Sequence, residues 1–279
     1  MKLIRFGERG NEKPGLLKED RVIDLRKIFP DIPDISEAFF RQGWLDKVKD
    51  ATDQGEKIDV RLSWPVCHPS KIICLGKNYV EHAKEGGMDV PEKPLLFGKT
   101  PNTLCGPYDP IVLPTGSGQV DWEVELAVII GKEGKKIKKK DAFDYIAGYT
   151  VMNDVSGREA QFSDQQWFRG KSFDTFAPMG PAFVTADEID DVHNLKLTAI
   201  VDGVTMQDGN TKDLIFDIPT IIEFISENMT LVPGDIISTG TPEGVGIFRN
   251  PPVVLKEGNV VECAVEKIGS IKNKVVKEG

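Results

Sequence analysis

The amino-acid sequence predicts an α+β fold in which β-strands dominate. Many short apolar segments are separated by turn residues, a pattern typical of β-rich folds. Few segments have helical spacing, and the strict alternation of strands and helices expected of a TIM barrel or a Rossmann fold is absent from the sequence. We therefore expect a rolled, mainly antiparallel sheet with few helices.

The first 63 residues are expected to form a small N-terminal α/β domain. Short strands at 3–6, 16–17 and 22–25 precede a helix near 35–51. A polar stretch at 53–57 and the pair Trp64-Pro65 then mark a change in composition. We place the boundary near Ser63, so that residues 64–279 form the larger domain.

The larger domain is expected to consist mostly of strands. Turn residues separate nearly all of the candidates, which are 72–75, 111–113, 120–130, 145–153, 183–185, 195–201, 236–239, 253–255 and 260–265. A helix is predicted at 218–228, where Pro219 suits a first helical turn and Ile218, Ile221, Ile222 and Ile225 form one apolar face. We expect this helix to pack on the core.

Composition excludes several classes of protein. The chain has 279 residues, of which 40% are hydrophobic, so it can bury a sizeable core. A net charge of −9 argues against nucleic acid as a partner, because that affinity depends on cations that neutralise phosphates. Neither a segment of about 20 apolar residues nor a signal peptide is found, so we expect no membrane partner and a cytoplasmic location. The four cysteines lack the spacing of a zinc site and fit reduced, packed thiols.

Two glutamates in the predicted strand 120–130 suggest a metal site. Side chains alternate between the faces of a strand, so Glu123 and Glu125 should point the same way, while the opposite face, from Trp122 to Ile130, is apolar. Burying two ionised carboxylates is costly unless a cation compensates, and a divalent metal would do so. The alternative is an edge strand whose glutamates are solvated.

Asp154 is a third candidate ligand, at the end of the predicted strand 145–153. Three carboxylates without a nearby histidine favour Mg²⁺, Mn²⁺ or Ca²⁺ over Zn²⁺. An ordinary turn aspartate at a strand end is the alternative for this residue.

His82 and Glu85 are candidates for general base chemistry. The segment 76–87 reads as a strand end, a helix cap at Asn78 and a short helix stopped by glycines. On one helical turn the two side chains can meet, and the carboxylate would orient the imidazole and raise its basicity. An exposed surface pair is the alternative.

Two further segments are candidates for binding an anion. Lys171 lies between small residues and Phe173, and the glycine-rich loop 237–246 follows a predicted strand. A lysine with a hydroxyl or a backbone N–H beside a metal can stabilise an oxyanion or an enolate. For the loop, a tight β corner that requires glycines is the alternative.

Five ordered motifs resemble the fumarylacetoacetate hydrolase family from about Lys71 to the C-terminus. They are GKNYVEHAKE, DWEVEL, NDVSGREAQ, GKSFDTFAPMGP and STGTPEGVG. The resemblance implies a mixed β-roll catalytic domain, a Mg²⁺ or Mn²⁺ cofactor, a homodimer and chemistry on small 2-oxo or 2,4-dioxo acids. Leu75 replaces a further aspartate ligand of fumarylacetoacetate hydrolase itself, and the N-terminal part is shorter, as in bacterial members. The stretch 206–211 looks like bacterial hydrolases of 2,4-diketo-3-deoxy sugar acids.

The resemblance also implies roles for ten residues by position. Glu123, Glu125 and Asp154 match the metal ligands, and His82 with Glu85 matches the dyad of acylpyruvase-like members. Residues matching the wall of the substrate cavity are Arg158, Gln161, Lys171 and Thr241, with Lys99 as a further candidate.

We hypothesise that the metal chelates the carboxylate and 2-oxo group, so that cleavage of the C3–C4 bond leaves a metal-bound enolate stabilised by Lys171. His82 would activate the attacking water. Without that attack, the same site could decarboxylate oxaloacetate, and an isomerase of an unsaturated 2-oxo dicarboxylic acid or a non-catalytic, metal-stabilised protein are further alternatives. The segment Phe162 to Phe168 is either a lid over the substrate or an ordinary packed connection.

Overall fold

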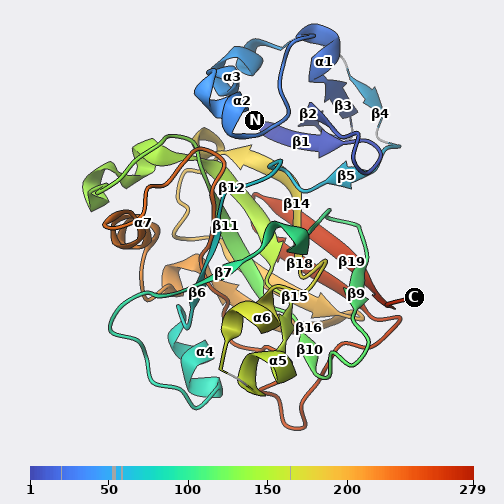
Figure 1. Cartoon of the computed structure of the whole chain (residues 1–279), viewed down its shortest axis with the longest axis vertical. Helices are drawn as coiled ribbons and strands as arrows, with labels where there is room; N and C mark the ends of the chain where they lie inside the picture. The colour runs from blue at the N-terminus through green and yellow to red at the C-terminus, as the bar shows by residue number, and fades with distance from the viewer. Residues whose placement is uncertain (20, 52–54, 58, 164) are drawn as a thin grey trace.

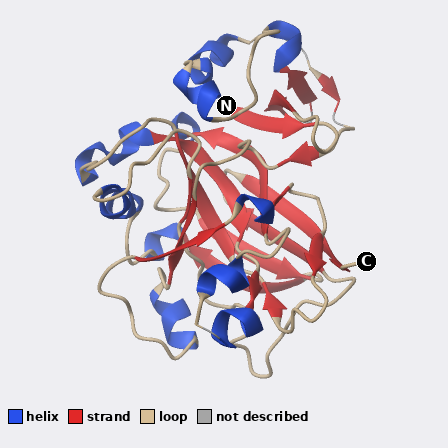
Figure 2. Cartoon of the chain, in the orientation of Figure 1, coloured by secondary structure: helices blue, strands red, loops and turns tan. Residues whose placement is uncertain are grey.

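β-Strands form most of the regular structure, as the sequence predicts (Figure 2). The computed structural model describes residues 1–19, 21–51, 55–57, 59–163 and 165–279. Helices lie at the periphery of the sheets (Figure 1). The α+β, β-dominated class is therefore confirmed.

The larger sheet runs through the whole molecule. In the described part of the chain it has twelve strands, in the order β4 (Glu56–Lys57), β3 (Arg21–Asp24), β2 (Lys13–Lys18), β1 (Lys2–Phe6), β14 (Ala177–Thr185), β12 (Ile146–Asn153), β11 (Val124–Ile130), β17 (Ile236–Ser238), β6 (Ile72–Gly76) and β7 (Leu95–Lys99), with β5 (Leu62–Ser63) on β1 and β8 (Leu104–Cys105) on β14. The N-terminal strands thus continue the sheet of the larger part through the pairing of β1 with β14. The domain boundary near Ser63 stays a prediction.

A second sheet packs beside the first. Its five described strands are β16 (Val204–Asn210), β15 (Lys196–Val201), β18 (Val260–Val265), β19 (Gly269–Lys277) and β9 (Ile111–Leu113). A short pair, β10 (Val120–Asp121) with β13 (Ser156–Gly157), lies next to the start of β11.

The helices are short. They are α1 (Leu25–Ile28), α2 (Glu37–Arg41), α3 (Trp44–Lys47), α4 (Val80–Glu85), α5 (Arg158–Ser163), α6 (Trp167–Lys171) and α7 (Ile218–Ser226). Single turns of 3₁₀ helix occur at Val48–Asp50, Pro101–Thr103, Ala186–Glu188 and Thr211–Asp213, and a longer 3₁₀ segment at Lys139–Tyr145. Across the described ranges, no helix is both long enough and apolar enough to cross a membrane.

Strand β11 separates two hydrophobic cores. Leu126 and Val128 belong to the core that includes the second sheet and α7. Ala127 and Ile129, on the opposite face, belong to the core built by the N-terminal strands and helices. Alternation along the strand therefore places Glu125 on the side that faces the N-terminal part.

Strand directions gather several chain segments at one edge of the larger sheet. Strand β11 is antiparallel to both β12 and β17, and β17 is parallel to β6. The start of β11 therefore lies beside the ends of β12, β17 and β6. Three segments meet here: the one with Asp154 after β12, the loop after Ser238 of β17, and the one that follows Gly76 of β6.

Several predicted elements differ from the structure. The prediction of one continuous helix at 35–51 is wrong, because Gly43 has a left-handed backbone (φ 69°) and separates α2 from α3. Residues 253–255 form no strand. The sequence analysis missed β16, which is an exposed edge strand, and β19, whose buried face includes the polar residue Asn273.

Candidate metal centre and active site

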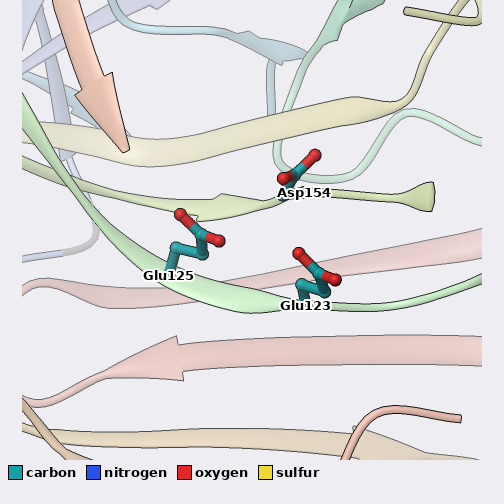
Figure 3. Close-up of side chains that lie close together, drawn as sticks. All are labelled: Glu123, Glu125 and Asp154. Carbon is teal, nitrogen blue, oxygen red and sulfur yellow. The ribbon is translucent and has the colours of Figure 1, made fainter. Parts of the chain in front are cut away.

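Three buried carboxylates converge at the edge where these strands meet. Glu123 and Glu125 project from the beginning of the β11 segment toward Asp154, which follows the end of β12 (Figure 3). One oxygen atom from each of the three groups lies within 4.8 Å of the others. Their exposed fractions are 5%, 1% and 0%, so the solvated edge strand proposed as an alternative is wrong.

A break in the strand helps to place Glu123. The predicted strand 120–130 is divided between β10 and β11, and Glu123 lies just before β11. Its backbone N–H donates to the side-chain oxygen of Asn153 (3.0 Å), and its carbonyl accepts from the N–H of Asp154 (2.8 Å). These bonds hold the first and third carboxylates in register although neither residue lies in a regular strand.

Two lysines bind two of the three carboxylates from within the protein. The Nζ atom of Lys171 donates to Glu123 (2.7 Å) and to Asp154 (2.8 Å). The Nζ atom of Lys99 donates to the other oxygen of Asp154 (2.6 Å) and to the carbonyl of Val155 (3.2 Å). Lys171 occupies the last position of α6, so this short helix presents the lysine to the cluster.

Arg158 connects the cluster to a fourth carboxylate. Its guanidinium donates to Glu123 (2.7 Å), to Asp121 (2.6 Å) and to the side-chain oxygen of Gln161 (3.0 Å). Asp121 is fully buried and also accepts from the backbone N–H of Ile247 (2.8 Å). The sequence analysis missed Asp121, although it lies two residues before Glu123, where strand alternation predicts that both side chains point the same way.

These contacts shift the pKa values of the two glutamates in opposite directions. Burial alone would raise the pKa of Glu123, but Lys171 and Arg158 outweigh it and hold this pKa below its usual range. For Glu125, burial is reinforced by repulsion from Asp154 and Glu123, and the pKa rises to about 8. Within the described residues, Glu125 is bonded by the hydroxyl of Ser238 and the N–H of Gly240 but by no cation.

The surplus charge is the observation that fits a metal ion. Four buried carboxylates, those of Asp121, Glu123, Glu125 and Asp154, face three buried cations. Glu125 is therefore the one carboxyl of the four without a cationic partner among the described residues, and its raised pKa means that a proton compensates its charge when no metal does. An all-oxygen donor set with excess negative charge suits Mg²⁺ or Mn²⁺.

His82 and Glu85 form a hydrogen-bonded pair on α4. Nδ1 of His82 lies 2.9 Å from Oε1 of Glu85, and the other carboxylate oxygen of Glu85 accepts from the N–H of Gly244 (2.9 Å). His82 is only 6% exposed, so the surface pair considered as an alternative does not describe it. Helix α4 ends at Gly86, as expected from the glycines.

The predicted cap at Asn78 is wrong. Tyr79 is the residue that precedes the first turn of α4. The Asn78 side chain instead donates to the carbonyls of Phe216 (3.1 Å) and Thr239 (2.8 Å) and accepts from the N–H of Phe216 (2.8 Å). Asn78 therefore ties the end of β6 to the loop after β17.

A small cavity joins the dyad to the cluster. Of the ten residues selected from the sequence, those that line it are His82, Glu123, Arg158, Gln161, Lys171 and Thr241. Its volume is about 30 Å³, which is room for roughly two water molecules. Lys99 lies behind Asp154, outside the lining, so its expected contact with a substrate is not part of this arrangement.

Gln161 and Thr241 differ in what they can offer a ligand. Gln161 accepts from Arg158 through its oxygen, which leaves its amide N–H groups as donors. The hydroxyl of Thr241 donates to the carbonyl of Val124 (2.9 Å) and accepts from Gln207 (2.8 Å). Its hydroxyl hydrogen is thus already used within the protein.

Helices α5 and α6 cover one side of the cavity. Phe162 and Trp167 line it, and the Trp167 ring packs edge-on against Phe97 at a centroid distance of 5.5 Å. Phe162 and Phe168 are 47% and 56% exposed, so a large part of each side chain faces solvent. Whether this segment acts as a lid stays a prediction.

Comparison with known proteins agrees with the fold and the motifs. The family model described as fumarylacetoacetate (FAA) hydrolase C-terminal matches residues 71–276. A mitochondrial oxaloacetate tautomerase of Xenopus laevis is 44% identical over 288 residues, which cover 99% of this chain and 90% of the relative.

Two solved structures share the whole fold. Fumarylacetoacetate hydrolase from Exiguobacterium antarcticum superposes with a TM-score of 0.87 at 36% identity, and the match covers 100% of both chains. Maleylpyruvate hydrolase from Sphingobium sp. SYK-6, solved with manganese(II) and pyruvate, gives a TM-score of 0.83 at 32% identity, again over 100% of both chains. The predicted β-roll fold is thereby confirmed.

Proposed function

Because this chain belongs to the fumarylacetoacetate hydrolase family, we propose that it is a metal-dependent enzyme that interconverts the keto and enol forms of a small 2-oxo acid. Oxaloacetate is the first candidate substrate, since the similar protein from Xenopus laevis is named an oxaloacetate tautomerase. The observation that carries the proposal is the His82–Glu85 dyad, which shares one cavity with Glu123 of the carboxylate cluster.

Tautomerisation requires one proton to leave carbon and another to reach oxygen. In the keto-to-enol direction, His82 would take the proton from C3 while the 2-oxo oxygen gains one from solvent or a protonated neighbour. The bond from Nδ1 to Glu85 leaves Nε2 as the ring nitrogen that exchanges the proton. Glu85 would fix the tautomer of the imidazole and stabilise its charged form.

Glu123, Glu125 and Asp154 would hold Mg²⁺ or Mn²⁺, which when bound acts as a Lewis acid on the 2-oxo group. Lys171 and Arg158 keep Glu123 ionised, so that it remains a ligand at neutral pH. Gln161 has amide donors left for the substrate carboxylate. The near absence of open space keeps bulk water away from the reacting carbon.

Hydrolysis of a C–C bond in a 2,4-dioxo acid is the second candidate function. The cavity has room for about two water molecules next to His82, and the same base could activate one of them. The likeness to maleylpyruvate hydrolase supports this reading. Both candidates use the same base and the same metal ligands.

Turnover by metal-loaded protein distinguishes the candidates. The panel contains the enol form of oxaloacetate, an acylpyruvate and a 2,4-diketo-3-deoxy sugar acid. The tautomerase proposal expects accelerated loss of enol absorbance without release of pyruvate. Pyruvate from the acylpyruvate would favour hydrolysis, and pyruvate with CO₂ from oxaloacetate would favour decarboxylation. Inactivity toward the whole panel with Mn²⁺ bound would contradict an enzymatic role on these acids.

A homodimer and a cytoplasmic location remain proposals from the sequence. The Xenopus laevis relative is named as a mitochondrial protein, so a mitochondrial location is the alternative to a cytoplasmic one. Imaging of the full-length chain with a C-terminal tag would separate the two locations.

A further inference from the structure

Lys77 is a cation at the wall of the cavity that the proposed mechanism does not use. It follows directly after β6, and it lines the cavity together with His82, Arg158 and Lys171. The other two permanent cations are already committed, because Lys171 is bonded to Glu123 and Asp154, and Arg158 to Glu123 and Asp121. Neither has a full charge left for a ligand.

Lys77 differs from them in having no anionic partner. Over the described ranges of the chain, no carboxylate forms an ion pair with its ammonium group, and the side chain is partly buried. Nearby Lys84, on the next helix, is paired with Glu81. Among the lysines and arginines that line the cavity in the described part of the chain, Lys77 is therefore the one whose charge can pair with an anionic ligand.

The backbone holds Lys77 in an unusual conformation. Its φ angle is +57°, in the left-handed region that favours glycine or asparagine. A side chain in this region costs free energy that the surrounding structure must offset, and such backbone outliers are often found at functional sites.

Both neighbours fix this conformation. A Cβ atom added to Gly76 would lie 2.4 Å from a ring carbon of Trp167, so that the chain passes directly against the indole. On the other side, the three side-chain hydrogen bonds of Asn78 bind it to the loop after β17 and to Phe216. Lys77 is thus presented to the cavity from a rigid corner rather than from a mobile loop.

The charge of the substrate completes the argument. A 2-oxo acid that approaches the carboxylate cluster through its 2-oxo group and adjacent carboxylate has one negative charge matched by the bound divalent ion. A second carboxylate at the far end of the acid needs another cation, because burying it unpaired is costly. Lys77 is the cation that remains.

We infer that Lys77 determines substrate specificity by pairing with the distal carboxylate, so that the site selects dicarboxylic over monocarboxylic 2-oxo acids. This inference rests on the proposed function, since it assumes that a 2-oxo acid binds at the carboxylate cluster. Lys77 forms a bond to a part of the substrate that does not react, and it transfers no proton.

The test compares two substrates that differ in one charge, oxaloacetate and its 4-methyl ester. Metal-loaded, full-length protein is assayed for the ratio of kcat/KM between them. We expect Lys77→Met to lower this ratio by about 10- to 100-fold, because a charge-assisted hydrogen bond changes an equilibrium by about that factor. Lys77→Arg should keep most of the preference, since it retains the charge.

Lys77→Gly serves as the folding control. Glycine adopts a positive φ angle without steric cost, so this variant should unfold at a temperature no lower than that of the native protein. Its substrate ratio should fall as in Lys77→Met. A ratio that is unchanged in both Lys77→Met and Lys77→Gly, with the native protein active, would overturn the inference and leave the proposed function intact.

Binding gives a readout that does not depend on turnover. The ligands are 3,3-dimethyloxaloacetate, which has no proton on C3 and cannot enolise, and its 4-methyl ester. Calorimetry should show tighter binding of the diacid to the native protein and loss of that preference in Lys77→Met. If the native protein turned over no 2-oxo acid but showed this pattern, the proposed function would fail and the role of Lys77 would stand. Equal binding of the two ligands by the native protein would refute the role.

Discussion

Nδ1 of His82 lies 2.9 Å from Oε1 of Glu85, and the second carboxylate oxygen of Glu85 accepts the backbone N–H of Gly244. One carboxylate therefore orients the imidazole and holds the loop after β17. The dyad is attached to two separate chain segments, so its geometry does not depend on the short helix α4 alone.

Replacement of the base should separate catalysis from metal binding. We expect His82→Asn to lower kcat by about 10²- to 10⁴-fold, the usual contribution of a general base. Affinity for Mn²⁺ should not change, because His82 is not one of the candidate metal ligands. Glu85→Gln should lower kcat by less. Steady-state kinetics together with Mn²⁺ titration measures both quantities.

Glu81 provides the matched control for these variants. It lies on the same helix as the dyad, but it is exposed, and its ion pair among the described residues is with Lys84. Glu81→Gln should leave kcat within about twofold, since exposed pairs contribute little. A normal rate in His82→Asn would refute the assigned role of the histidine.

Loss of Glu125 should weaken metal binding without unfolding the protein. Glu125→Gln removes the charge that lacks a counterpart and keeps the shape and the contacts of the side chain. We expect Mn²⁺ affinity to fall by at least about 100-fold, because one of three hard oxygen ligands loses its charge. Calorimetry at pH 7.5 measures this, with the exposed Glu257→Gln as control. Unchanged affinity in Glu125→Gln would place the metal elsewhere.

The metal-free protein should become less stable as the pH rises from about 5 to 8. Glu125 has its pKa raised from 4.5 to about 8, so the folded state binds a proton that the unfolded state releases. The stability from this group is fully present below pH 4.5 and is lost as the pH passes through about 8. Thermal unfolding in the presence of a chelator, at several pH values, measures the trend.

Two comparisons test the cause of this trend. In Glu125→Gln the fall in melting temperature between pH 5 and 8 should be smaller, because the titrating group is gone. Saturating Mn²⁺ should also flatten it, since the metal replaces the proton. If the variant retained the full pH dependence of the native protein, Glu125 would not be its source.

Substrate entry should require movement of α5 or α6. A cavity of about 30 Å³ is far too small for a four-carbon acid, and Phe162 and Trp167 form part of its wall. We expect oxalate with Mg²⁺ to slow proteolytic cleavage between Phe162 and Phe168, because a ligand that binds the closed form orders the cover. Cleavage at other exposed sites serves as the internal reference. Equal cleavage with and without ligand would favour a permanently packed connection.

The local sequence pattern was sufficient to predict that the carboxylates of Glu123 and Glu125 point in the same direction. Alternation predicted that Glu123 and Glu125 share a face, and it held even though the strand breaks just before Val124. The same alternation included Asp121, which was overlooked because its importance depends on Arg158, 37 residues further along the chain. Charge partners brought together by the fold leave no signal in local spacing.

Segments that contain a buried asparagine were harder to predict. Strand β19 was missed because Asn273 interrupts its apolar face, yet in the structure Asn273 is buried and donates to the carbonyls of Gly106 and Asp109. Asn78 was read as a helix cap because that role is local, whereas its partners lie more than 130 residues away. In both cases a tertiary hydrogen bond overrides the local preference of asparagine.

Strand β1 covers an edge of β14 that would otherwise be unpaired. Leu3 pairs with Phe183, and Lys2 with Val184, so a chain that began near residue 64 would expose this stretch of β14 as a free sheet edge. Such edges recruit strands from other chains, and the truncated protein would aggregate rather than fold as a smaller enzyme. Ala127 and Ile129 lie two and four residues from Glu125 on the same face of β11, and they share their hydrophobic core with N-terminal residues such as Leu3. The same cut would therefore remove part of the packing beside the metal site.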